Sequence, residues 1–135
     1  MATRAKTRLD QIQTLLSDRT FKNRIMSFLE KYMECEVVCK ELIVENRAKS
    51  RNPVKYDDVE IVFGSVQAAV RNASMKIDEN TLKRIFTANT KKGERSAKKL
   101  RDAIVHKMPN SELKEVNRRY KELMKDMKAF LRAVK

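Results

Sequence analysis

The segment Arg101-Asp102-Ala103-Ile104-Val105-His106 holds the only histidine of this 135-residue chain. Histidine is the side chain that most readily exchanges a proton near neutral pH, and arginine carries a permanent, planar charge that matches a phosphate. On a helix, Asp102 and His106 lie four residues apart and share one face, so the carboxylate can accept a hydrogen bond from the imidazole and fix its tautomer. These three residues predict acid–base chemistry at a phosphate ester. The alternative is a surface histidine at the end of a basic helix.

A dense cluster of basic residues surrounds this segment. Residues 83–135 hold 17 basic and 6 acidic side chains, whereas residues 1–82 hold 14 and 12, so most of the net charge of +13 lies in the C-terminal part. A solvated helix face explains balanced charge but not this excess, which is typical of a polyanion-binding surface. Nucleic acid is the favoured partner over an acidic protein. A membrane surface is less favoured, because the basic helices lack a wide aromatic face.

The composition argues against a metal site and against a nucleotide-binding loop. A zinc site needs about four ligands, and beyond His106 the chain offers only Cys35 and Cys39 as soft donors. The two cysteines are either a redox or metal pair or, as we expect, two small buried residues on one face of a helix. Gly64 and Gly93 stand far apart, which excludes a glycine-rich phosphate loop. Carboxylates are not clustered for a two-metal site, and we expect no metal and no cofactor.

The scarcity of turn residues indicates a helical protein. Glycine and proline make up only 4 of 135 residues, too few for the turns of a many-stranded β architecture. We expect an all-α protein, a compact single-domain bundle of about four to six helices over residues 1–135. The longest apolar-rich stretch, residues 61–70, is half as long as a membrane span requires, and the N-terminal residues show no secretion signal. With no disulfide scaffold expected, the chain is predicted to be soluble and cytoplasmic.

Four helices are expected before the basic cluster, each from its apolar spacing and capping residues. They are a short helix through residues 9–16, a second that starts at Asp18 or Thr20, a third that follows Asp57 and Asp58, and a brief one after Asp78. We expect the third to be the most buried, because it is the most apolar segment.

Two further helices enclose the residues that could do chemistry. One runs from about residue 94 to residue 107, and Pro109 prevents it from extending past Met108. The other begins at Asn110 or Ser111, and its apolar residues form an unbroken seam with spacings of three and four: Leu113, Val116, Tyr120, Leu123, Met127, Phe130 and Val134. Such a seam is equally compatible with packing inside the bundle and with packing against a second subunit.

The string from Leu100 to His106, near a helix end and before a long amphipathic helix, resembles the HEPN superfamily (higher eukaryotes and prokaryotes nucleotide-binding domain). Ribonucleases of this family carry an arginine, four to six intervening residues and a histidine, with a polar residue after the arginine. The resemblance implies a compact helical bundle and a metal-independent endoribonuclease of a toxin or phage-defence type.

The resemblance also implies roles for individual residues. His106 would act as general base or acid on the ribose 2′-hydroxyl or the leaving oxygen, and Arg101 would stabilise charge developing on the phosphate. Asp102 would orient the pair, and nearby lysines would hold the RNA backbone: Lys98, Lys99 and Lys107. The family further implies a homodimer in which two motifs face one cleft, with an antitoxin or regulatory protein as another partner. A dimer would ease one difficulty, since Arg101 and His106 lie about 140° apart on an ideal helix.

Two alternatives of other classes remain. One is a nonenzymatic basic helical nucleic-acid-binding protein, and the other is a noncatalytic helical module that binds a partner protein. An enzyme depends on His106, whereas purely electrostatic binding of nucleic acid should hardly change when that residue is lost. A module that binds only a protein predicts little affinity for RNA at physiological salt.

Overall fold

Seven α-helices make up the part of the chain that the structure, a computed structural model, describes: residues 3–107 and 110–134. They are α1 (Arg4–Ser17), α2 (Arg19–Arg47), α3 (Phe63–Asn72), α4 (Glu79–Phe86), α5 (Ala97–Lys107), α6 (Asn110–Arg118) and α7 (Tyr120–Ala133), with one 3-10 turn, η1 (Tyr56–Asp58). Helices account for 75% of the structure, and the described residues contain no strand. The all-α prediction is confirmed, with one helix more than the expected maximum of six. Met108 and Pro109, at which we expected the fifth helix to stop, lie outside the described residues.

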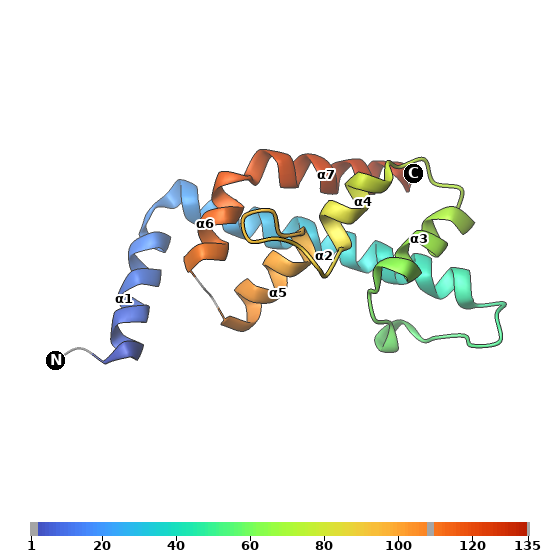
Figure 1. The fold of residues 1–135 in the computed structure, drawn as a ribbon, viewed down its shortest axis with the longest axis horizontal. Helices are drawn as coiled ribbons and strands as arrows, with labels where there is room; N and C mark the ends of the chain where they lie inside the picture. Colours follow the sequence, from blue (N-terminus) through green and yellow to red (C-terminus); the bar gives the residue numbers. More distant parts are fainter. Residues whose placement is uncertain (1–2, 108–109, 135) are drawn as a thin grey trace.

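The long helix α2 runs through the centre of the bundle and contacts α1, α3, α5, α6 and α7, whereas α4 packs mainly on α7 and α5 (Figure 1). Its cap is one of the two predicted, because Asp18 Oδ1 accepts a hydrogen bond from the backbone N–H of Phe21 at 3.1 Å. Tyr32 of α2 joins an aromatic cluster with Phe86 of α4 and Phe130 of α7. The ring centres of Tyr32 and Phe86 are 6.4 Å apart, and those of Phe86 and Phe130 are 5.1 Å apart. This cluster ties α4 and α7 to the central helix.

The segment before α3 does not follow the prediction. Asp57 and Asp58 lie in η1, the backbone is extended at Val59 and Val62, and α3 begins only at Phe63. The late start is explained by three β-branched residues, Val59, Ile61 and Val62, because β-branched side chains lose rotamer freedom in a helix and favour extended backbone. Nor is this segment the most buried one. Val62 is 55% exposed, and the most extensive buried face belongs to α2.

Helices α4 and α5 carry the chain into the predicted functional segment. Helix α4 follows the prediction, with Asp78 at its N-cap position and three apolar residues buried: Leu82, Ile85 and Phe86. Helix α5 begins at Ala97, three residues later than expected. The reason is Ser96, whose Oγ accepts a hydrogen bond from the N–H of Lys99 at 3.1 Å and donates one to the carbonyl of Thr87. The serine therefore caps α5 and closes the loop that precedes it.

The expected last helix is broken at Arg119 into α6 and α7, which accounts for the seventh helix. Arg119 departs from helical geometry with φ −100° and ψ 16°. Its guanidinium donates to the Glu115 carboxylate at 2.6 Å and to the carbonyl of Arg95 at 2.8 Å. The predicted seam is nevertheless buried in the bundle except for the half-buried Tyr120 and the exposed Val134. The seam is therefore core, and it is not available for packing against a second subunit.

Helix α1 attaches to one end of the bundle through polar contacts, and it buries no residue fully. The guanidinium of Arg8 donates to the carbonyl of Lys107, and Nδ2 of Asn110 donates to Oε1 of Gln11 at 2.9 Å. Among the helices described, none combines the length and the apolar character needed to cross a membrane.

Candidate nucleic-acid interface

The loop between α4 and α5, residues 87–96, is held in place by one buried carboxylate. Glu115 of α6 is 3% exposed and accepts hydrogen bonds from the backbone N–H groups of Gly93 at 3.2 Å and Arg95 at 2.9 Å. It also accepts hydrogen bonds from the guanidinium groups of Arg95 at 2.9 Å and Arg119 at 2.6 Å. Gly93 has a φ of +87°, which L side chains rarely adopt. Glu115, its arginine partners and this glycine thus fix the loop against α6.

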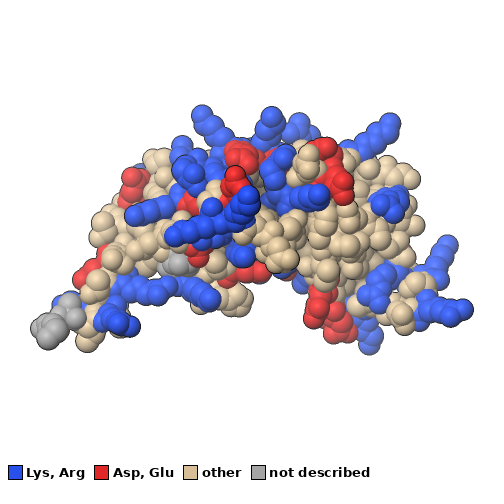
Figure 2. Space-filling view, in the orientation of Figure 1, with Lys and Arg blue, Asp and Glu red and all other residues tan. Residues whose placement is uncertain are grey.

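The loop, α5 and the start of α6 surround a hollow of about 730 Å³ whose wall is largely basic. Its charged and titratable lining side chains are Lys92, Arg95, Lys98, Lys99, Asp102, His106, Lys107 and Glu112. Figure 2 shows Lys and Arg side chains gathered over α6 and the loop before α5. Five of the six site residues predicted from the sequence line this hollow, and only Arg101 does not.

Arg101 turns away from the hollow and toward α2. Its Nη1 donates to Asp102 at 2.8 Å, its Nη2 lies 3.6 Å from Oε2 of Glu36, and its guanidinium carbon lies 5.8 Å from the ring centre of Tyr32. Burial raises the pKa of Tyr32, and the charges of Glu36 and Asp102 raise it further, so the phenol stays protonated beside the guanidinium. The structure therefore does not bring Arg101 and His106 together within one chain.

Asp102 shares the hollow with His106 but does not orient it. Its carboxylate accepts hydrogen bonds from Arg101 at 2.8 Å and from Lys98 at 3.5 Å. Within the described part of the chain, no hydrogen bond joins Asp102 to His106, so that expectation was wrong. The Arg101 guanidinium and the Lys98 ammonium thus provide the hydrogen-bond donors of this carboxylate. His106 is left exposed in the last turn of α5.

The basic residues of the hollow divide into paired and unpaired groups. Arg95 lies 3.2 Å from Glu112 and 2.9 Å from Glu115, and Lys98 lies 3.5 Å from Asp102. The other three lysines of the hollow form no ion pair with a described carboxylate: Lys92, Lys99 and Lys107. These three, with His106, are the groups free to meet an anion.

Six residues that line the hollow were not among the predicted site residues: Ala88, Thr90, Lys92, Arg95, Ala103 and Glu112. Thr90 of the loop lines the hollow, and its Oγ1 accepts a hydrogen bond from the N–H of Ser96 at 3.3 Å. An uncharged threonine in a loop carries no sequence signal of such a position, which depends on how Ser96 and Glu115 fold the loop.

The two cysteines are buried in the core and form no disulfide. Burial raises the pKa of Cys35 and of Cys39 to about 12, and Sγ of Cys35 lies 3.6 Å from the carbonyl oxygen of Met127, to which it donates. The interpretation as packing residues is confirmed. Across residues 3–107 and 110–134, no three His, Cys, Asp or Glu side chains are placed to hold a metal ion.

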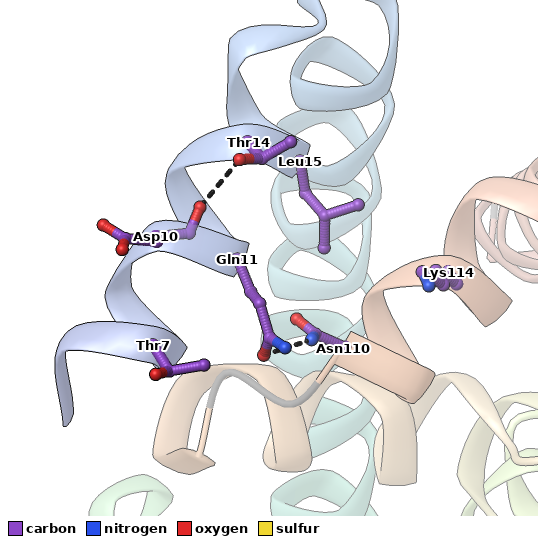
Figure 3. A pocket seen from close by; sticks show the side chains of 7 residues that line it. All are labelled: Thr7, Asp10, Gln11, Thr14, Leu15, Asn110 and Lys114. Atoms are coloured by element: carbon purple, nitrogen blue, oxygen red, sulfur yellow. Dashed lines mark hydrogen bonds between the residues drawn. The ribbon is translucent and has the colours of Figure 1, made fainter. Parts of the chain in front are cut away.

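A second hollow, of about 390 Å³, lies between α1 and the start of α6 (Figure 3). Gln11 and Asn110 face each other across it and are joined by the hydrogen bond of 2.9 Å, while Thr14 Oγ1 donates to the carbonyl of Asp10 at 2.8 Å. Its charged residues, Asp10 and Lys114, are of opposite sign, so it lacks the positive excess of the first hollow. Its contacts attach α1 to the bundle.

Comparisons with known proteins assign no family to the chain. No protein-family model matches it, and neither a curated protein nor a solved structure gives a significant match. The fold and the site define it by class, as a single-domain all-α bundle with a basic hollow that includes a histidine.

Proposed function

We propose that the protein binds the sugar–phosphate backbone of RNA in the basic hollow. The observation that carries this proposal is the convergence of Lys92 from the loop with Lys99 and Lys107 from α5 on one hollow, without carboxylate partners. A volume of about 730 Å³ lies in the range of small-ligand sites and can accept a short piece of a strand. Phosphates that replace counterions at these lysines release the counterions, which favours binding at low salt.

The test is a salt titration of fluorescein-labelled RNA binding, followed by fluorescence anisotropy. Lys98→Ala with Lys99→Ala should weaken binding and reduce the salt slope by at most about 1.4, since each phosphate contact to a single strand contributes about 0.7. The matched control, Lys49→Ala with Lys55→Ala, removes two exposed lysines from the loop after α2. Equal losses in both double variants would contradict the assignment of the hollow. No binding by the wild type would favour a module that binds a protein partner.

A second candidate function is metal-independent cleavage of the bound RNA. It is favoured by the exposed imidazole of His106, which lines the same hollow as the unpaired lysines. His106 would accept the proton of a ribose 2′-hydroxyl, whose oxygen would form a bond to the adjacent phosphorus while the bond from phosphorus to the 5′-oxygen breaks. The departing 5′-oxygen would take up a proton from water. Lys99 and Lys107 would stabilise the phosphate charge. The resemblance to HEPN ribonucleases implies the same chemistry with Arg101, which lies toward α2 in this chain.

Cleavage is tested by incubating mixed RNA and DNA with the purified protein in EDTA. We expect RNA alone to be cut, with products that end in a 2′,3′-cyclic phosphate. His106→Ala should abolish cleavage and leave RNA affinity nearly unchanged, whereas Val105→Ala, at the neighbouring exposed position, should change neither. Cleavage by His106→Ala at the wild-type rate would leave RNA binding as the function.

A homodimer belongs to the same proposal, because it would bring Arg101 of one copy toward a shared site. The seam of α6 and α7 is core, so another surface must form the contact. The outer face of α2 exposes Met26, Met33 and Val37, and Glu36 beside them pairs with Arg101. Analytical ultracentrifugation should detect a dimer that Met33→Glu dissociates. A wild type that is monomeric at every concentration would contradict this part of the proposal and leave an antitoxin or another regulatory protein as the partner of that face.

A further inference from the structure

Six basic side chains form a single row along the outer face of α6 and α7, here called the α6–α7 basic row. All are exposed, and they recur at intervals of four and three residues: Lys114, Arg118, Lys121, Lys125, Lys128 and Arg132. These positions lie opposite the buried seam, so the row points away from the core. At 1.5 Å per residue, the part of the row on α7, from Lys121 to Arg132, is about 17 Å long, and Lys114 and Arg118 precede it on α6, before the break at Arg119. Figure 2 shows basic side chains projecting along the edge of the molecule that α7 forms.

The row is not balanced by acidic side chains. Every carboxylate of α6 and α7 is bound to an arginine outside the row: Glu112 and Glu115 to Arg95, Glu122 to Arg119, and Asp126 to Arg84. None of the six cations forms an ion pair within the described residues. Like charges three or four residues apart destabilise a helix, so a merely solvated face would be more stable with alternating signs. A row of one sign therefore indicates a polyanionic ligand.

The row is continuous with the basic hollow. Nη2 of Arg118 donates to the carbonyl of Gly93 at 3.2 Å, which places the row against the loop before α5. Gly93 directly follows the exposed Lys91 and Lys92, and Lys92 lines the hollow. A strand that leaves the hollow past Lys92 therefore meets the row at Arg118 and can follow it along α7.

We propose that the α6–α7 basic row binds the phosphates of a single RNA strand that extends out of the hollow. This inference rests on the proposed binding of RNA in the hollow and assigns a second, longer part of the RNA footprint. Cations in single file, with Cβ atoms about 5–6 Å apart, match one strand rather than the two strands of a duplex. None of the exposed residues from 114 to 132 is aromatic, so the contacts go to phosphates and are independent of base sequence.

A membrane surface fits the row less well. Helices that lie in a membrane interface insert an apolar face between the lipids. The apolar face of α7, with Leu123, Met127 and Phe130, is buried in the core and is not available for insertion. Only electrostatic attraction remains, and a narrow row on a convex edge suits a linear polyanion better than a flat surface.

The test compares two triple variants of the full chain that lose the same charge. The row variant combines Lys121→Ala, Lys125→Ala and Lys128→Ala. The control variant combines Lys49→Ala, Arg51→Ala and Lys55→Ala, in the loop after α2 on the side away from α7. These six side chains are exposed and form no ion pair in the described part of the chain, so both variants should fold, which circular dichroism checks. Labelled oligouridylates of about 6 and about 20 nucleotides are titrated at several salt concentrations.

We expect the row variant to bind the longer RNA about 10- to 100-fold more weakly than the wild type, with a salt slope shallower by about 2. The shorter RNA, which the hollow accommodates, should lose less than about threefold, and so should both RNAs with the control variant. If the row and control variants bind the longer RNA with equal affinity, the proposal that the row binds RNA is refuted, whereas the proposed binding of RNA in the hollow is not affected. If binding of the longer RNA depends on the row but does not change with Lys98→Ala and Lys99→Ala, the proposed binding of RNA in the hollow is refuted instead.

Two further outcomes decide the chemistry of the ligand. The proposal is refuted if phosphatidylserine vesicles or polyglutamate bind through the α6–α7 basic row as tightly as the longer RNA does. Vesicle binding would identify a membrane as the ligand of the row, and polyglutamate binding would identify an acidic protein. If the wild type binds neither RNA length, the row and the hollow are both refuted as RNA-binding surfaces.

Discussion

Loss of the buried Glu115 carboxylate should strongly reduce the stability of the fold, because this group holds the loop before α5 against α6. It accepts four hydrogen bonds, two from the backbone N–H groups of Gly93 and Arg95 and two from the guanidinium groups of Arg95 and Arg119. Glu115→Gln keeps the size of the side chain but replaces one acceptor oxygen by an NH₂ group. That group faces N–H donors, so about half of the hydrogen bonds are lost. The two guanidinium groups also lose the buried carboxylate that they share, and they keep only the more exposed Glu112 and Glu122 as partners.

The expected loss of stability follows from these contacts. Two hydrogen bonds to a charged group, at about 1.5 kcal/mol each, give about 3 kcal/mol. Breaking a buried ion pair costs about 3–5 kcal/mol, and the low end applies because the Arg95 and Arg119 side chains keep 14% and 11% exposure. For a chain of this length, about 3 kcal/mol corresponds to a melting temperature lower by roughly 10–15 °C.

The assay is thermal and urea unfolding followed by circular dichroism. Glu122→Gln serves as the matched control, since Glu122 pairs with the same Arg119 at 3.2 Å but its side chain is 50% exposed. A surface pair of this kind contributes about 0–1 kcal/mol. If Glu115→Gln costs less than about 1 kcal/mol, or no more than Glu122→Gln, the assignment of Glu115 as the anchor of the loop is refuted.

Three further predictions follow from individual residues. Ser74, after α3, has a φ of +54°, a backbone conformation that is strained for a residue with a Cβ atom. Ser74→Gly should therefore raise the free energy of unfolding in urea by about 0.5–1 kcal/mol, and a lower free energy of unfolding would contradict this backbone strain. Burial raises the pKa of Cys35 and Cys39 from 9.0 to about 12, so the unfolded chain releases these protons first. The free energy of unfolding should therefore fall above pH 9 by up to about 1.4 kcal/mol per pH unit and thiol, and Cys→Ala variants should flatten that profile. Arg101→Ala should weaken RNA binding about 3- to 10-fold, because the Asp102 carboxylate then loses its closer cation, keeps only the 3.5 Å contact with Lys98 and repels phosphate. Asp102→Asn in the same chain should restore binding, whereas the loss of a direct contact between Arg101 and RNA would not be rescued.

The helical class and most helices could be predicted because their signals are local. Caps such as Asp18 and apolar spacings of three and four act within a few residues of the chain. The break at Arg119 could not be predicted, since residues 118–120 contain neither glycine nor proline. Its cause is a set of contacts to Glu115 and to the carbonyl of Arg95, which lies 24 residues away. The late start of α5 has a similar origin, because Ser96 is held by the distant Thr87.

The candidate site could be predicted in composition but not in arrangement. Residues four apart, such as Asp102 and His106, share one side of α5 by helical periodicity, and the hollow contains both. The same periodicity separates Arg101 from His106, yet the residues that receive the guanidinium, Tyr32 and Glu36, lie on α2 and carry no signal in the motif. The partners of a side chain depend on which helices pack together, and this information is not in a six-residue segment.

The charges around the hollow explain the position of Arg101. Two carboxylates line the hollow, Asp102 and Glu112, and each would attract lysines and repel a phosphate if it were left alone. Arg101 binds the first at 2.8 Å from outside the hollow, and Arg95 lies 3.2 Å from the second. Each arginine thus neutralises a carboxylate with a fixed, permanently charged group, which leaves the unpaired lysines of the hollow available to an anion. Arg101 can in this way favour binding of a polyanion without touching it, because its effect is transmitted through the charge of Asp102.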